Sequence, residues 1–209
     1  MFSERIKALA KYIDKTDKVV DVGCDHGYLC IYLKQNKLCK EVIASDISEN
    51  ALSYAINNFK KYNYDIKTFV SDGFEKVKGK FDTAVIAGMG TSTILKIITH
   101  KKTPQKLILG SHNDLYKLRL NLNKMGYSIK NETAVFENNH YYIIMKCLKG
   151  KQRLSKSKLK YGICNNKDYY EYLITKNKRI LHKVPLTKKV KLMLENRVLT
   201  NLLKKCGTI

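Results

Sequence analysis

Two kinds of apolar pattern alternate along the first 125 residues, and this alternation constrains the fold more than any other feature of the chain. Short runs such as KVVDVG and AVIA have the length and the β-branched composition of buried strands. Between such runs, apolar residues recur at helical spacing. Strands that alternate with helices form a doubly wound parallel sheet. We expect strands over residues 18–23, 41–47, 65–73, 81–90 and 105–111, and helices over residues 3–13, 28–37, 49–62, 91–100 and 114–125.

Two further strands follow without a helix between them. The segments YSIKNETAVFE and HYYIIMKCL, residues 127–137 and 140–148, are joined by the turn NNH and predict an antiparallel hairpin at or near one sheet edge. Five strand–helix units closed by such a hairpin make a seven-stranded sheet like that of methyltransferases that use S-adenosylmethionine. That likeness is one of fold, and fold alone does not fix function.

The pattern changes after Gly150. We interpret residues 153–162, RLSKSKLKYG, as a polar connector. Residues 168–183 and 187–205 then show helical apolar spacing on either side of Pro185, which predicts an antiparallel helical hairpin. The apolar face expected for the second helix consists of Val190, Leu194, Val198 and Leu202, with Leu199 and Leu203 beside them.

The formal net charge is +22, which favours a polyanionic partner, with nucleic acid first among the candidates. An AT-rich genome would supply many lysines without selection for binding, but it would not explain why acids are so few. Residues 151–209 carry 16 Lys and Arg residues against three acids, whereas residues 1–150 carry 24 against 15. We therefore expect a first domain of residues 1–150 and a basic helical hairpin, residues 151–209, that contacts the nucleic acid.

Several classes of protein are disfavoured. No apolar run approaches the roughly 20 residues that cross a bilayer, and the amphipathic N-terminus lacks the apolar core of an export signal. We therefore expect a cytoplasmic protein without a membrane partner. None of the six cysteines is spaced as C-x-x-C, so reduced thiols and no metal site are expected.

Glycines and acids stand at the carboxyl ends of four expected strands, where an open parallel sheet binds its ligand. Gly23 permits a tight turn and a close approach of the backbone to a ligand. Asp46 lies near the spacing expected for an acid that accepts hydrogen bonds from ribose hydroxyls. The alternative role for Asp46, N-cap of the next helix, suits Ser48 better. Asp72 with Gly73 either forms a simple turn or lies beside an adenine, whose amino group Asp72 accepts.

The first strand end reads GCDHG and lacks the G-x-G-x-x-G of dinucleotide-binding proteins. A pyrophosphate needs bare amides at a helix N-terminus, and Asp25 would place a negative charge against it. S-adenosylmethionine has no phosphate and carries an ammonium and a sulfonium, so Asp25 favours a methyl donor over a dinucleotide. An alternative that stays open is that Asp25 and His26 cap the following helix.

The fourth strand end, AVIAGMG, bears on the acceptor. Methyltransferases that alkylate exocyclic amines often carry an Asn/Asp-Pro-Pro-aromatic motif here, and this chain has only two prolines, Pro104 and Pro185. Gly88 and Gly90 leave room for a planar base. The expected acceptor is a ring nitrogen, which has its own lone pair and needs no prior deprotonation.

These motifs resemble the TrmK family, the bacterial tRNA (adenine-N1)-methyltransferases that modify the adenine at tRNA position 22. The resemblance covers nearly the whole chain and rests on the segments RIKALAKYI, DVGCDHGYL, ASDI, SDGF, IAGMG, LIL and HYYIIM. It implies a Rossmann-like class I SAM-dependent methyltransferase sheet with a C-terminal α-helical hairpin, a coiled coil. The chain departs from the family pattern at Cys30 for Pro, at Thr91 for Gly, and at Gly110-Ser111 for Gln-Pro.

The resemblance also implies a function, the SAM-dependent methylation of N1 of adenine 22 in tRNA by a monomer. Asp25 is the candidate catalytic residue, either by stabilising the positive charge on the base or by accepting a proton from its amino group. Arg5 and Tyr28 are expected on the substrate side, with burial in the core as the alternative for Tyr28. Other functions that stay open are methylation of another RNA base and RNA binding with SAM but without catalysis. The expected cofactor-binding residues are Gly23, Asp25, His26, Asp46, Ile47, Asp72, Gly73, Gly88, Met89 and Gly90.

Overall fold

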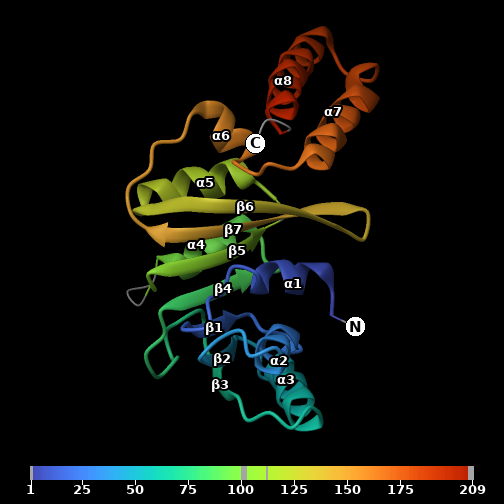
Figure 1. Ribbon diagram of the computed structural model, residues 1–209. Helices are drawn as coiled ribbons and strands as arrows, with labels where there is room; N and C mark the ends of the chain where they lie inside the picture. Colours follow the sequence, from blue (N-terminus) through green and yellow to red (C-terminus); the bar gives the residue numbers. More distant parts are fainter. Residues whose placement is uncertain (1, 100–102, 112, 207–209) are drawn as a thin grey trace. The chain divides into compact units, whose positions relative to one another are not determined.

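The computed structural model describes residues 2–99, 103–111 and 113–206 (Figure 1). Its helices are α1 Glu4–Ala10, α2 Tyr28–Gln35, α3 Glu49–Lys61, α4 Thr91–Ile98, α5 Leu115–Lys124, α6 Lys156–Tyr161, α7 Lys167–Leu181 and α8 Leu186–Lys205. Its strands are β1 Lys18–Val22, β2 Glu41–Asp46, β3 Lys67–Val70, β4 Thr83–Ala87, β5 Lys106–Ser111, β6 Tyr127–Glu137 and β7 His140–Lys149. The expected helix 91–100 is α4, and its last predicted residue, His100, lies outside the described residues.

The seven strands form one sheet in the order β3-β2-β1-β4-β5-β7-β6, which confirms the predicted seven-stranded class. β1 to β5 run parallel, and β7 lies antiparallel between β5 and β6. The edge strand of the predicted hairpin is therefore β6. The chain order reverses between β1 and β4, which is the switch point where such sheets bind ligands beyond the strand ends.

Helices cover both faces of the sheet, with α1, α2 and α3 on one face and α4 and α5 on the other (Figure 1). The strands between them are rich in Val, Ile and Ala because both of their faces are buried; Val19, Val85 and Ile108 are fully inaccessible. Ser48 is the N-cap of α3 and accepts a hydrogen bond from the Ala51 amide at 3.2 Å, so Asp46 does not cap that helix.

A buried ion pair links the hairpin to α5. Arg119 Nε of α5 lies 2.6 Å from Glu132 Oε1 of β6, and both side chains are completely inaccessible to solvent. Two charges at such depth are stable only when they are paired. The pair therefore ties the edge strand to the helix that packs against it.

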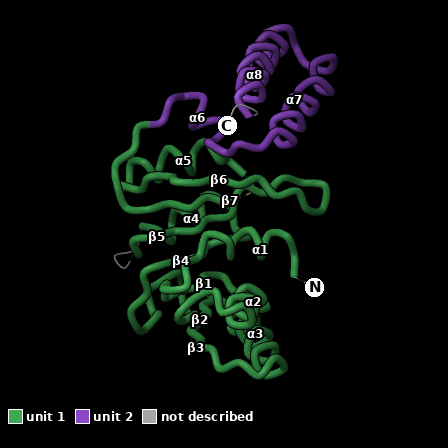
Figure 2. Tube along the Cα trace, viewed as in Figure 1, with its two compact units in different colours: residues 1–153 green, residues 154–209 purple. Residues whose placement is uncertain are grey.

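The chain divides into two compact units, unit 1 with residues 1–153 and unit 2 with residues 154–209 (Figure 2). Unit 2 contains α6, α7 and α8, and α7 packs against α8, with Asn177 Nδ2 2.9 Å from Asn196 Oδ1. The interpretation of residues 153–162 as a connector was wrong. Residues 156–161 form α6, which buries Leu159. Its N-cap is Ser155, whose hydroxyl accepts from the Lys158 amide.

The apolar face predicted for α8 was wrong in part. Val190, Leu194 and Val198 are exposed, whereas Leu199, predicted beside that face, is buried. Leu192, which was not predicted, is buried as well. Apolar residues occur on more than one side of this helix, and the packing against its neighbours selects a different side from the one with the longest repeat. Although α8 has 20 residues, neither it nor any other helix in the described part of the chain is long and apolar enough to cross a membrane.

Candidate active site

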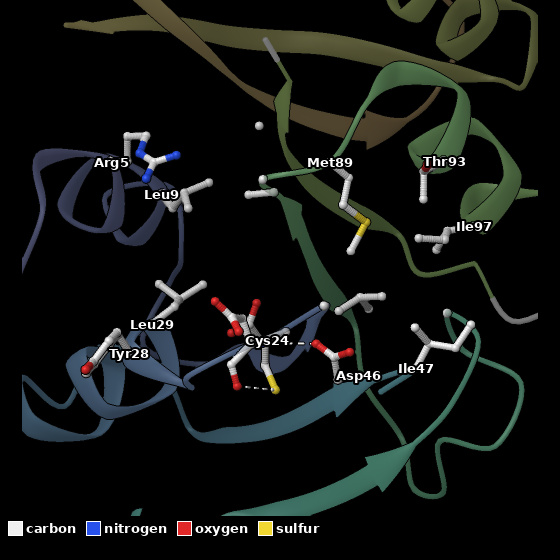
Figure 3. Close-up of a pocket in the computed structure, with 18 of the residues that line it drawn as sticks. Arg5, Leu9, Cys24, Tyr28, Leu29, Asp46, Ile47, Met89, Thr93 and Ile97 are labelled. Atoms are coloured by element: carbon white, nitrogen blue, oxygen red, sulfur yellow. Dashed lines mark hydrogen bonds between the residues drawn. The ribbon is translucent and has the colours of Figure 1, made fainter. Parts of the chain in front are cut away.

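A cavity of about 840 Å³ opens beyond the carboxyl ends of the central strands of unit 1 (Figure 3). Its walls come from the loops after β1, β2, β3 and β4, from α1 and α4, and from β7. Gly90 is absent from its lining and instead precedes α4 as the N-cap. The other residues expected at the site all line the cavity, namely Arg5, Gly23, Asp25, His26, Tyr28, Asp46, Ile47, Asp72, Gly73, Gly88 and Met89.

The first turn is built by left-handed backbone at both of its glycines. Gly23 has a φ of 73° and Gly27 a φ of 71°, a region that residues with a side chain rarely adopt. The N-cap of α2 is Gly27, with no side-chain cap hydrogen bond. The alternative that Asp25 or His26 caps this helix is therefore not what the structure shows. Asp25 itself has a φ of 48°, so it is held in a strained conformation at the rim of the cavity.

The carboxylate of Asp46 ties two loops together. Its Oδ2 accepts from the Asp25 amide at 3.1 Å, and its Oδ1 accepts from the Ser48 amide at 2.9 Å. The residue is buried but lines the cavity. Each carboxylate oxygen accepts more than one hydrogen bond, so the same group can also receive donors from a ligand. Its orientation is fixed in advance, which suits a pair of ribose hydroxyls.

Asp21 is a site residue that the sequence analysis missed. It lies in β1 and is 6% exposed, yet it borders the cavity. The Cys30 thiol donates to its Oδ2 at 3.5 Å. Burial, together with the charge of Asp46, raises the pKa of Asp21 to about 7. An acid within an otherwise apolar strand was the signal available in the sequence, because a buried carboxyl of this kind requires a partner.

An ion pair lies at the third strand end, where the sequence predicts the site for the adenine of the cofactor. Lys96 of α4 places its Nζ 2.6 Å from Asp72 Oδ2, and this contact raises the pKa of the lysine. Gly73 has a φ of 58°, and its carbonyl accepts from the Ser45 hydroxyl at 3.4 Å. Asp72 and Gly73 therefore form a fixed corner of the cavity as well as a turn.

The loop after β4 covers the turn after β1. Figure 3 shows Met89 pointing into the middle of the cavity. A Cβ added at Gly23 would come within 2.0 Å of the Met89 methyl, so Met89 lies directly over the glycine. The loop is held at its far end because the Thr91 amide donates to Asn113 Oδ1 at 2.9 Å. Thr91 and Ser111, which both depart from the family pattern, place their hydroxyls 3.1 Å apart.

The opposite wall combines α1 with β7. Arg5 forms an ion pair with Glu137 of β6, and its guanidinium lies 4.4 Å above the ring of Tyr142. Arg5 and Tyr142 both line the cavity. Sequence reasoning named Arg5 but missed Tyr142, because no spacing rule connects residues so far apart in the chain. Tyr28 is 43% exposed, so the alternative of a buried packing role for it was wrong.

The charges around the cavity select the kind of ligand. Among the described residues, four carboxylates border it, those of Asp21, Asp25, Asp46 and Asp72, and two permanent cations, Arg5 and Lys96, are each paired with a carboxylate. Phosphate groups would meet net negative charge here, whereas a cation would be stabilised. Burial raises the pKa of the Cys24 thiol, which also lines the cavity, so Cys24 is not an activated nucleophile. The site therefore suits direct group transfer from a bound cationic donor.

Known proteins share the sequence and the structure. The family described as "Methyltransferase domain" matches residues 2–145. A protein of Mycoplasma genitalium named "Putative tRNA methyltransferase" is 33% identical over 150 residues, which is 68% of this chain and 67% of the relative. The tRNA (adenine(22)-N(1))-methyltransferase of Bacillus subtilis is 29% identical, over 68% of this chain and 63% of its own. The structure of M. capricolum TrmK with S-adenosyl-homocysteine is similar with a TM-score of 0.81 and 30% identity, over 98% of each chain.

Proposed function

Because the chain belongs to the methyltransferase-domain family, and within it to the TrmK family, we propose that it transfers a methyl group from S-adenosylmethionine to N1 of adenine 22 in tRNA. The observation that carries this proposal is the cavity at the strand ends, where four carboxylates and two already paired cations favour a cationic cofactor without phosphates. The proposed acceptor, adenine 22 of tRNA, is inferred from the relative that is named for this activity.

The cavity residues fit the parts of this cofactor. Asp46, oriented by the amides of Asp25 and Ser48, would accept from the ribose hydroxyls. Asp72 and Gly73 would hold the adenine, and the glycine turn at Gly23 would admit the methionine part close to the backbone. Buried Asp21 lies where it would stabilise a positive charge on that part. When bound, the cofactor supplies an electrophilic methyl group on its sulfonium.

The acceptor side requires an adenine that has left the tRNA stack. Gly88 leaves that side open, since a Cβ added there would meet no atom of the described residues within 4 Å. N1 has its own lone pair and becomes part of a cation once it carries a methyl group. Asp25, whose side chain is 70% exposed at the cavity rim, would stabilise that charge or accept a proton from the amino group. Asp25 is therefore the proposed catalytic residue.

Unit 2 is the proposed tRNA-binding part. Residues 151–209 carry 16 Lys and Arg residues against three acids, and the lysines of α8 at positions 188, 191, 204 and 205 are exposed. Exposed lysine side chains attract phosphates without requiring a precise geometry. In this proposal α7 and α8 pack on each other as a coiled coil.

The proposed place of action is the cytoplasm, where tRNA is available, and the proposed acting form is a monomer. Light scattering coupled to size exclusion should give one mass near 24 kDa in the concentration range of the assay. A dimer at those concentrations would contradict the monomer.

The test is methylation of unmodified tRNA by the full chain, followed by mass spectrometry of the nucleosides and mapping of the modified position. We expect one 1-methyladenine per tRNA at position 22, and none when that adenine is replaced by guanine. Methyl groups on another base would favour the other RNA specificity. Cofactor binding without any methyl transfer would favour the non-catalytic alternative.

A further inference from the structure

Three aromatic side chains lie side by side where α2 meets α3. The ring of His26 is 5.8 Å from that of Tyr28 and 5.6 Å from that of Tyr54, measured between centroids, with interplanar angles of 35° and 52°. His26 and Tyr28 also line the cavity. The three rings, which we call the rim rings, therefore form a row from the cavity mouth onto the outer surface of α3.

The rim rings are unusually exposed for a group of neighbours. Tyr54 is 58% exposed, Tyr28 is 43% exposed, and the His26 side chain is 47% exposed. A single exposed aromatic residue is ordinary, because much of a protein surface is apolar. A contiguous row beside a ligand cavity is more informative, since exposed apolar patches mark interaction sites.

Contacts between the loop and α3 hold the residues of the rim rings in place. The side-chain amide Nδ2 of Asn58 in α3 donates to the His26 carbonyl at 3.0 Å, which fastens the loop to that helix. Gly27 packs so closely on α3 that a Cβ there would come within 2.4 Å of the Phe59 ring. The loop and α3 therefore hold the backbone that carries the three rings in one arrangement before binding.

The proposed function identifies what this surface fits. When a target base leaves the tRNA stack and enters the cavity, the adjacent nucleotide in the strand loses one of its stacking partners. Aromatic side chains replace that contact, because every base has a π-face and stacks on such rings whatever its identity. A peptide partner would not explain why the row begins at the cavity mouth, or match a chain with a charge of +22.

We propose that His26, Tyr28 and Tyr54 form a stacking surface for the nucleotide next to the methylated base. This inference rests on the proposed function and extends it to a second nucleotide. Tyr54 lies outside the cavity lining, so it acts on tRNA binding and not on the cofactor. It is a positioning residue, and its ring matters more than its hydroxyl.

The test compares Tyr54→Ala, Tyr54→Phe and the control Tyr62→Ala, which removes a tyrosine that is 42% exposed at the end of the same helix. We expect Tyr54→Ala to raise the Kd and the KM for unmodified tRNA about 5- to 100-fold, the usual range for losing one stacked base. Tyr54→Phe and Tyr62→Ala should stay within about twofold of wild type. Cofactor Kd and unfolding midpoint should be unchanged in all three.

A second readout follows stacking itself. A bound tRNA with 2-aminopurine beside adenine 22 should fluoresce less in the wild-type complex than in the Tyr54→Ala complex, because stacking on the ring quenches this base. Wild-type Kd and quenching in Tyr54→Ala would overturn the stacking surface even if position 22 is methylated. Binding that depends on Tyr54 without methylation at position 22 would instead overturn the proposed function alone. A wild-type protein that does not bind tRNA would overturn both.

Discussion

Units 1 and 2 carry their charges in opposite ways. In unit 1 the charged groups that fix the geometry are buried and held by specific partners, such as Glu132 on Arg119 and Asp46 on two backbone amides. In unit 2 most lysines project from α7 and α8 into solvent, and the ion pair of Lys160 with Glu195 is partly exposed. Buried charge fixes geometry, whereas exposed charge supplies attraction without fixed geometry.

The difference matches the two tasks of the proposed reaction. A methyl transfer needs the donor and acceptor positioned closely, and misplacement of about 1 Å is costly. Phosphate attraction extends over roughly 8 Å in physiological salt and tolerates mobile side chains. A sheet with carboxylates at its strand ends serves the first task, and lysine-rich helices serve the second.

The largest expected effect contrasts the two ion pairs. Glu132→Ala leaves Arg119 charged and buried without its carboxylate, and should lower the free energy of unfolding by about 3–5 kcal/mol. Glu195→Ala removes the partly exposed partner of Lys160 and should cost at most about 1 kcal/mol. Denaturant titration followed by circular dichroism measures both. Equal decreases in the free energy of unfolding of the two variants would contradict the difference between the units.

The next effect concerns the cofactor. Asp46→Ala removes the acceptor for the ribose hydroxyls and the tie between the loops, so the Kd for S-adenosylhomocysteine should rise at least about 100-fold. The control Ser48→Ala removes only the N-cap of α3 and should change that Kd by less than about threefold. Calorimetric titration gives both values. An unchanged Kd in Asp46→Ala would remove this carboxylate from the cofactor site.

A smaller effect depends on pH. Folding raises the pKa of Asp21 to about 7, so the stability that its proton contributes is present below pH 4 and is lost as the pH rises to about 7. A cationic ligand favours the ionised form instead. Cofactor affinity should therefore increase from pH 5.5 towards pH 7, by up to about tenfold per unit, and then level off. Asp21→Asn should show a flat profile, and a flat profile in wild type would contradict the role of Asp21.

The sequence predicted most of unit 1 because its signals are local. The segment YSIKNETAVFE is β6 residue for residue, and glycines mark the ligand-facing turns. Asp21 was missed because the sequence shows only a single acid in a buried strand. That this acid borders a cavity depends on how the strands and loops assemble. Tyr142 was missed for a related reason, since its contact with Arg5 joins β7 to α1, which lie near opposite ends of the sequence of unit 1.

Unit 2 was predicted less well, although its two long helices were found. The cap at Ser155 was visible, but the charged stretch after it resembled a linker. For α8 the sequence offers two apolar sides, one through Leu194 and one through Leu199. Periodicity identifies an amphipathic helix but does not choose between such sides, because that choice depends on the neighbouring helix.

The division of labour between the units is tested most directly by titrating one variant with both ligands. The variant replaces Lys188, Lys191 and Lys205 of unit 2 with alanine; its control replaces Lys76, Lys78 and Lys80 of unit 1, also exposed lysines, with the same change in charge. We predict that the unit 2 variant binds S-adenosylhomocysteine like wild type but binds tRNA more weakly. The slope of log K against log salt should be shallower by about two to three. Equal tRNA affinity and salt slope in the unit 2 variant and wild type would contradict the account.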